Sequence, residues 1–222
     1  MLAALKLPPV AALVIVSLAA GCVHSPSPPE SSASYAGSRR FSIETFDGRL
    51  LAYQIFLATN RVRADYGLNP LYDMAELDSA ADLQAEHTSL MALNEHDNPV
   101  RGEHTVSDRV AKAGVVAVFA AENAIVEPAR LPSEAPDRDY TYAQVAETIV
   151  QDWMGSPGHR VNILASRFNR LGCAARAGHI APWDQRIYAI QDFCEVDERA
   201  GEVPKTYTQP RGMVSPRLVL PN

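Results

Sequence analysis

The stretch "TYAQVAETIVQDWMGSPGHRVNIL", residues 141–164, combines a helical pattern with an abrupt break. Its apolar residues recur at the spacing of one face of an α-helix: Val145, Ile149 and Trp153. Thr141 can cap the start of such a helix, and the segment "GSPG" at 155–158 is rich in residues that interrupt helices. We therefore predict a helix over 141–154, followed by a turn that presents His159. Since loops on a rigid scaffold often carry binding and catalytic residues, His159 is a candidate functional residue.

Helices and strands are also predicted elsewhere in the chain. The segment 49–68 has helical apolar spacing and ends at Gly67, while the Ala-rich segment 73–96 repeats the pattern. A short helical piece is predicted over 106–114. The β-branched and apolar runs predict strands over 115–120, 169–177 and 185–194. Because few βαβ units are present, this order favours an α+β sandwich over a doubly wound parallel sheet.

The two ends of the chain have compositions that do not suit a packed core. Residues 1–22 contain a short apolar run and end in "LAAGC", which resembles a bacterial lipoprotein signal and implies cleavage before Cys22 and acylation of its thiol. A plain secretory signal with a chance cysteine is the alternative. Residues 23–40 form a Ser/Pro-rich tether, and 201–222 a proline-containing tail. Residues 41–200 are then long enough for one domain.

The net charge and the cysteine content limit the kinds of partner and the cellular compartment that we expect for this protein. The net charge is −6, and no Lys/Arg stripe with interleaved aromatics is present, so a nucleic-acid partner is not expected. Lipidation of Cys22 would leave Cys173 and Cys194 to form one disulfide, with two buried thiols as the alternative. Val23 is not an aspartate, which in a Gram-negative cell would favour sorting to the outer membrane.

The histidines are the candidate chemical groups. The metalloprotease, zinc-ribbon, P-loop and nucleophile-elbow motifs are absent from the sequence. His96, His104 and His159 each lie just past a predicted helix or in a predicted loop. Ser156 with His159 could form a nucleophile and base, but nothing nearby suggests an oxyanion hole. Two histidines with a carboxylate could instead hold a metal ion.

Five motifs in a specific order resemble the CAP superfamily, also called SCP or cysteine-rich secretory proteins. They lie within residues 48–195: "NRVR" with "GLNPL", "AADLQAEHTSLMA", "AENAI", "WMGSPGHRVNIL" and "RFNRLGCA". The resemblance implies a three-layer α-β-α sandwich with a central antiparallel sheet. It also implies a cleft that is lined by two histidines and acidic residues.

Matching the motifs assigns residues to that cleft. His96 in "MALNEHDNP" is the best match to the first histidine, with His104 in "GEHT" as the competitor. Glu122 and Asn123 match the glutamate and its companion, and His159 matches the second histidine. Ser156 stands where many eukaryotic members have a second glutamate, so this cleft has one carboxylate fewer.

Two functions follow from the resemblance. The first is a non-enzymatic, membrane-anchored binding module whose cleft takes a lipid, a cell-wall fragment or an envelope protein and requires no cofactor. The second is a hydrolase of peptide or envelope polymer that uses zinc or another divalent cation. In it His96, His159 and Glu122 would hold the ion, or the two histidines would hold it with a water while Glu122 acts as general base, so that Glu122 and His159 are the catalytic candidates. The missing carboxylate at Ser156 favours binding over catalysis.

Overall fold

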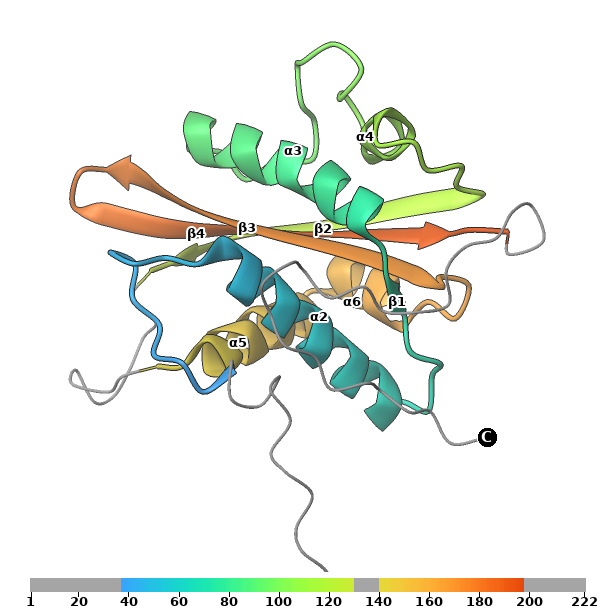
Figure 1. Cartoon of the computed structure of the whole chain (residues 1–222), viewed down its shortest axis with the longest axis horizontal. Helices are drawn as coiled ribbons and strands as arrows, with labels where there is room; N and C mark the ends of the chain where they lie inside the picture. Colours follow the sequence, from blue (N-terminus) through green and yellow to red (C-terminus); the bar gives the residue numbers. More distant parts are fainter. Residues whose placement is uncertain (1–36, 130–139, 198–222) are drawn as a thin grey trace, which may run out of the picture.

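The structure is a computed structural model that describes residues 37–129 and 140–197 as a layered α-β-α arrangement (Figure 1). The helices are α2 (Gly48–Asp65), α3 (Ala75–Met91), α4 (Val106–Lys112), α5 (Tyr142–Gly155) and α6 (Pro157–Leu164). The strands are β1 (Tyr72–Asp73), β2 (Phe119–Pro128), β3 (Arg170–Ala181) and β4 (Asp184–Glu195). Helices α3 and α4 cover one face of the sheet, and α2, α5 and α6 cover the other. The predicted three-layer α+β sandwich is therefore confirmed.

The sheet has the strand order β1-β3-β4-β2. Strands β3 and β4 form an antiparallel hairpin, and β2 pairs antiparallel with β4. The two-residue strand β1 pairs parallel with β3, so the sheet is mixed, although its three long strands are antiparallel as expected. Strand β2 lies at one edge of the sheet, which leaves one side of this strand open to the residues of the candidate site.

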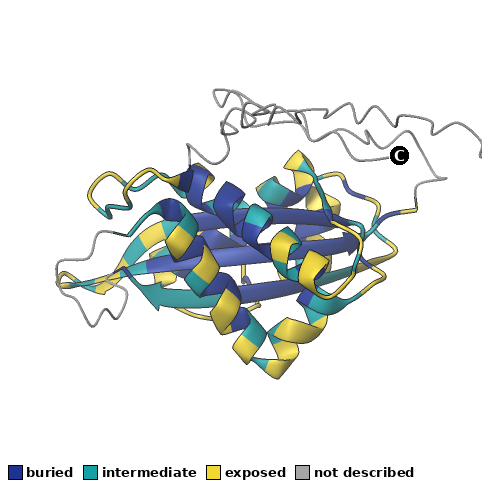
Figure 2. Ribbon diagram, turned by 90° about the horizontal axis from the view of Figure 1, so that it is seen from below, coloured by how far each residue is buried: buried dark blue, intermediate teal, exposed yellow. Residues whose placement is uncertain are grey.

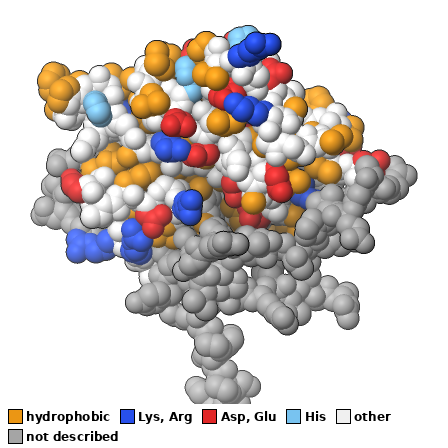
Figure 3. Space-filling model, turned by 45° about the horizontal axis from the view of Figure 1, so that its top comes forward, with side chains coloured by type: hydrophobic (Ala, Val, Ile, Leu, Met, Phe, Trp, Pro, Cys, Tyr) orange, Lys and Arg blue, Asp and Glu red, His pale blue; other side chains and the backbone are white. Residues whose placement is uncertain are grey.

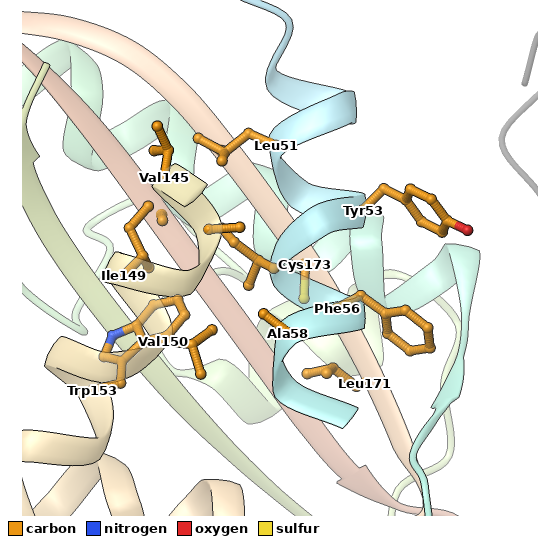
Figure 4. Close-up of a cluster of buried hydrophobic side chains, with 14 of the residues drawn as sticks. Leu51, Tyr53, Phe56, Ala58, Val145, Ile149, Val150, Trp153, Leu171 and Cys173 are labelled. Atoms are coloured by element: carbon orange, nitrogen blue, oxygen red, sulfur yellow. The ribbon is translucent and has the colours of Figure 1, made fainter. Parts of the chain in front are cut away.

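The larger apolar core lies between the sheet and helices α2 and α5 (Figure 4). Leu51 of α2 and Ile149 and Trp153 of α5 are fully buried there against Leu171 of β3. The helical spacing seen in the sequence therefore marks the faces that turn towards the sheet, and Figure 2 shows buried residues on these inner faces. A capping box formed by Thr141 and Gln144 starts α5 at the predicted position.

The segment after α5 differs from the prediction. Gly155 ends α5, but Pro157 begins α6 at once, and Ser156 is the shared cap of both helices. Proline is favoured at the first helical position, where its missing N–H has no intrahelical partner to lose. His159 therefore lies in the first turn of a helix and not in a loop.

Strand β2 begins later than the sequence pattern indicates. The run 115–120 is expected to be a strand, whereas β2 covers Phe119–Pro128 and contains the "AENAI" motif. Val116 and Val118 are exposed, because the strand is set by pairing with β4 and not by β-branched composition alone. This register places Glu122 and Asn123 inside the sheet.

Gly172 of β3 allows α3 to lie close to the sheet. A Cβ atom at this position would collide with the backbone of Leu77 and Asp78 in α3. The backbone N–H of the next residue, Cys173, donates to the Asp78 carboxylate at 2.8 Å. The glycine of the "LGCA" motif is therefore required by helix–sheet packing.

The predicted disulfide between Cys173 and Cys194 is wrong. In the β3–β4 register Cys173 lies opposite Gln191, and Cys194 lies opposite Arg170, so the two cysteines are three positions apart. Three positions along a strand also change the face, because side chains alternate. Cys173 accordingly packs in the core beside α2 and α5 (Figure 4), and Cys194 packs under α3 and α4. Both are buried free thiols.

The predicted signal, with its lipidation site Cys22, and the proline-containing tail lie outside the described residues, as does most of the tether. Within the described ranges, no helix is long and apolar enough to cross a bilayer.

Candidate functional site

The candidate site lies where the loop after α3, helix α4 and helix α6 meet the edge strand β2. The loop supplies His96, α4 supplies Arg109, β2 supplies Glu122 and Asn123, and α6 supplies His159. These residues are far apart in sequence, and the sheet edge brings them together.

Glu122 is the centre of the site. Its side chain is 2% exposed, and each of its two carboxylate oxygens has a partner. His96 Nδ1 lies 2.8 Å from Oε1, and the guanidinium of Arg109 forms an ion pair with Oε2. Because an unpaired charge is costly to bury, these two contacts explain how a glutamate can lie inside the sheet layer.

Arg109 was not identified from the sequence, although it lies in the "SDR" segment after the loop. It is fully buried, and it also donates to the backbone oxygens of Glu103, at 2.8 Å, and His96, at 3.3 Å. A capping box between Thr105 and Asp108 starts the helix that carries it. Arg109 therefore both neutralises Glu122 and holds the backbone of the loop that carries His96.

His159 faces His96 across the site. The centroids of the two imidazole rings are 6.5 Å apart, at an interplanar angle of 61°. Asn123 donates to the backbone oxygen of His159 at 3.2 Å, and Asn162 donates to Asn123 Oδ1 at 2.9 Å and to the backbone oxygen of Glu122 at 3.2 Å. These amide contacts fix α6 against β2, which sets the position of His159.

The two imidazoles have pKa values that are displaced in opposite directions. The hydrogen bond to Glu122 raises the pKa of His96, whose side chain is 57% exposed. Partial burial, followed by the neighbouring His96, lowers the pKa of His159. The hydrogen bond to Glu122 thus favours the protonated form of His96, and burial favours the neutral form of His159.

Asp192 lies behind Glu122 and was also not identified from the sequence. It is opposite Glu122 in the β2–β4 register and is fully buried. Neither of its oxygens accepts a hydrogen bond within the described part of the chain. Burial, followed by the charge of Glu122, raises the pKa of Asp192 well above its usual range, which favours the protonated form of this carboxyl.

The open part of the site is a pocket of about 250 Å³. Its lining combines one apolar residue with polar and ionisable ones: His96, Asp97, Thr105, Val106 and Glu122. The pocket therefore offers hydrogen-bonding groups beside apolar surface.

Two other candidates lie away from Glu122. His104 is exposed, and its Nδ1 lies 3.3 Å from the backbone oxygen of Asn98 within its own loop. It is thus His96 that contacts Glu122. Ser156 caps the α5–α6 junction, and its side chain forms no capping hydrogen bond with α6.

The residues of the site do not fit a metal ion. Among residues 37–129 and 140–197, no three His, Cys, Asp or Glu side chains are grouped so that they could hold one. The guanidinium of Arg109 takes one oxygen of Glu122 and brings a positive charge to the position that a cation would need. His96 Nδ1 is directed at the other oxygen.

Comparison with solved structures found proteins that are similar to parts of this chain. An extracellular protein containing an SCP domain from Bacillus anthracis str. Ames is 24% identical, with a TM-score of 0.50 over 67% of this chain and 41% of its own. A cysteine-rich secretory protein from Staphylococcus aureus is 20% identical, with a TM-score of 0.46 over 68% and 40%. An outer surface protein from Borrelia burgdorferi is 13% identical, with a TM-score of 0.49 over 72% and 99%.

This chain therefore spans about two fifths of the length of the first two of these proteins. At these identities the likeness concerns the fold alone. No protein with a curated description matches the chain significantly.

Family membership rests on the sequence match itself. The profile of the cysteine-rich secretory protein family, CAP, matches residues 56–179, which is more than half of the 222 residues. The matched range contains all of the residues at the sheet edge that the resemblance assigned: His96, Glu122, Asn123 and His159. The chain belongs to the CAP, or cysteine-rich secretory protein, family.

Proposed function

We propose that this protein is an exported, lipid-anchored binding module that uses the pocket at His96 and Glu122 to hold a polar envelope ligand. The observation that supports the proposal is the environment of Glu122. Its side chain is buried, and its two carboxylate oxygens contact Arg109 and His96. These contacts compensate the negative charge of the carboxylate and fix its orientation towards protein groups, which makes it a poor ligand for a cation and a poorly placed general base. In contrast, the exposed ring of His96 and the lining residues Asp97 and Thr105 can hydrogen-bond a ligand.

Export and anchoring are part of the same proposal. They are supported by the apolar run and the "LAAGC" ending of residues 1–22, and the Bacillus anthracis protein of similar fold is itself extracellular. The ligand classes that suit such a location are a lipid headgroup, a cell-wall fragment and an envelope protein. We expect Cys22→Ala to release the protein from membranes, and to release it from the outer membrane if the cell is Gram-negative. Retention of this variant on membranes would contradict the lipid anchor.

Zinc titration by calorimetry tests the pocket. We expect the full chain to show no micromolar zinc binding that depends on His96 and His159. His104→Ala is the matched control, because His104 lies in the same loop as His96 and does not contact Glu122. Zinc binding that is lost in His96→Ala and in His159→Ala, but kept in His104→Ala, would overturn the proposal in favour of the metal-dependent hydrolase.

A further inference from the structure

A cluster of exposed apolar side chains occupies one end of the molecule. Its members are four residues that are more than half exposed: Leu90 at 76%, Met91 at 57%, Ile180 at 54% and Trp183 at 86%. The first two lie in the last turn of α3, and the other two lie at the turn of the β3–β4 hairpin. We call these four residues the apolar tip. Such side chains are expensive to expose together, so a cluster of them indicates a contact surface.

The two halves of the tip are packed against each other. A Cβ atom at Gly178 would lie 3.0 Å from the backbone oxygen of Ser89, so the last turn of α3 lies directly on the hairpin. Figure 1 shows this end of α3 and the hairpin turn at the same end of the molecule, and Figure 3 shows hydrophobic side chains at that end among polar ones. The four residues of the tip therefore lie at one end of the molecule.

The charges beside the tip are neutralised by ion pairs. Arg176 of β3 pairs with Asp82 of α3 at 2.6 Å, and Arg186 pairs with Asp184 within β4 at 2.7 Å. These pairs bring no net charge to the surface. Glu86, one turn before Leu90 in α3, is exposed as well, so one acidic side chain lies beside the apolar ones.

The described chain begins at Gly37, which packs against Gln54 of α2 and Ala143 of α5. Arg40 forms a β-bridge with Thr141, and Gly48 lies against the backbone oxygen of Ala175 in the hairpin (Figure 1). Fourteen residues separate Cys22 from Gly37, and a chain of this length reaches at most about 50 Å when it is fully extended. A lipid at Cys22 would thus keep the tip within reach of the bilayer.

We propose that the apolar tip inserts into the boundary between headgroups and acyl chains of the membrane to which Cys22 anchors the protein. The proposal rests on the lipid anchor of the proposed function. Tryptophan is favoured at this depth, because its ring is apolar and its N–H can reach the headgroups. Four side chains fall well short of the roughly 20–30 residues per partner of a stable protein interface, whereas a bilayer requires no matching shape.

Insertion of the tip has a consequence for the pocket. Glu122 lies in the same row of the sheet as Gly172, ten residues before the turn at Pro182. At about 3.3 Å per residue this places the pocket roughly 30 Å from the tip along the sheet. Docking would therefore hold the pocket away from the bilayer, where it would meet a soluble or cell-wall ligand.

Tryptophan fluorescence tests the insertion directly. The chain has two tryptophans, of which Trp183 is 86% exposed and Trp153 is fully buried. We would reconstitute the full chain on vesicles of phosphatidylethanolamine and phosphatidylglycerol with brominated acyl chains. The expected result is a blue shift and a roughly twofold quenching of the Trp183 emission relative to unbrominated vesicles. Trp183→Phe, which leaves Trp153, should remove both effects.

The possible outcomes distinguish insertion of the apolar tip from membrane anchoring through Cys22. Co-sedimentation of the full chain and of Cys22→Ala with the vesicles measures anchoring, whereas quenching of the sedimented protein measures insertion. Protein that sediments while its Trp183 emission stays water-like and unquenched overturns the tip proposal and leaves the anchor intact. Protein that does not sediment in excess lipid overturns both. A dimer that forms without lipid and is lost in Trp183→Ser would assign the tip to a second copy of the chain instead.

Discussion

The two faces of the sheet are buried by side chains of different chemistry. Under α2 and α5, the fully buried residues include large apolar side chains such as Leu51, Ile149 and Trp153. Under α3 and α4, the apolar clusters are smaller, and buried ionisable residues lie among them, including Glu122, Arg109 and Asp192. The face under α2 and α5 thus supplies stability that does not depend on protonation. The face under α3 and α4 carries the site, and the charges buried there lower the stability of the fold.

The largest expected effect comes from removing the cation on the ionisable face. Arg109→Ala would leave Glu122 buried without its main counter-charge, beside the buried Asp192. We expect the free energy of unfolding to fall by about 4 kcal/mol, measured by urea denaturation. A second substitution, Glu122→Gln, should recover part of this loss, because it removes the charge that was left unpaired.

The exposed pair of Arg61 and Glu147 provides the control. Both of these side chains are about half exposed, and their atoms are 3.0 Å apart. Arg61→Ala should change the free energy of unfolding by less than about 1 kcal/mol. Equal losses in Arg61→Ala and Arg109→Ala would show that the Arg109–Glu122 pair is not the element that stabilises this face.

A large-to-small substitution on the apolar face should behave differently. Ile149→Ala deletes three buried carbons between α5 and the sheet, which we expect to lower the free energy of unfolding by about 3 kcal/mol. The loss should be the same at pH 5 and pH 8, because no ionisable group changes its surroundings. A loss that differs strongly between these two pH values would contradict the separation of the faces.

The sequence predicted the apolar face better than the ionisable face. Helices α2 and α5 have strong periodicity and clear caps, and their positions follow from those local signals. The family resemblance assigned His96, Glu122 and His159 to one cleft from their motifs alone. Local patterns can predict these helices because the apolar residues of each helix identify the face that is buried.

Arg109 and Asp192 could not be found in this way, because their roles depend on the register of strands and on a partner far along the chain. Arg109 looks like an ordinary helix surface residue, and Asp192 looks like a polar interruption of a strand. The same limit explains the error over Cys173 and Cys194. Adjacent strands were predicted correctly, but a three-position offset places the two thiols on opposite faces.

The pH dependence of stability should come from the ionisable face. Burial raises the pKa of Asp78 to about 6 and that of Asp73 to about 7, and it raises that of Asp192 well above its usual range. A carboxyl whose pKa is raised by folding costs nothing below its unfolded pKa, and its cost grows as the pH rises to the folded pKa. The free energy of unfolding should therefore decrease between about pH 4 and pH 7.

The raised pKa of His96 acts in the same direction from about pH 6.5 upwards, since the stability from a protonated His96 is lost as the pH rises through its folded pKa. Asp192→Asn removes one of these titrations. We expect this variant to equal the wild-type protein in stability at pH 4 and to become the more stable of the two as the pH rises to 8. Asp65→Asn, at the exposed end of α2, should show no such divergence. Parallel urea-midpoint curves for the wild type and Asp192→Asn would refute the assignment.

The smallest expected effect is that of a reductant, and it tests whether the two faces are joined covalently. A disulfide between Cys173 and Cys194 would close a loop of 21 residues and contribute about 3 kcal/mol. With the thiols on opposite faces, dithiothreitol should shift the free energy of unfolding by less than about 0.5 kcal/mol. Burial raises the pKa of Cys194 to about 12 and that of Cys173 well above its usual range, so both should resist alkylation in the folded protein. Peptide mapping after non-reducing alkylation in guanidinium should find both cysteines modified, and a bridged 173–194 peptide pair would require a different register between β3 and β4.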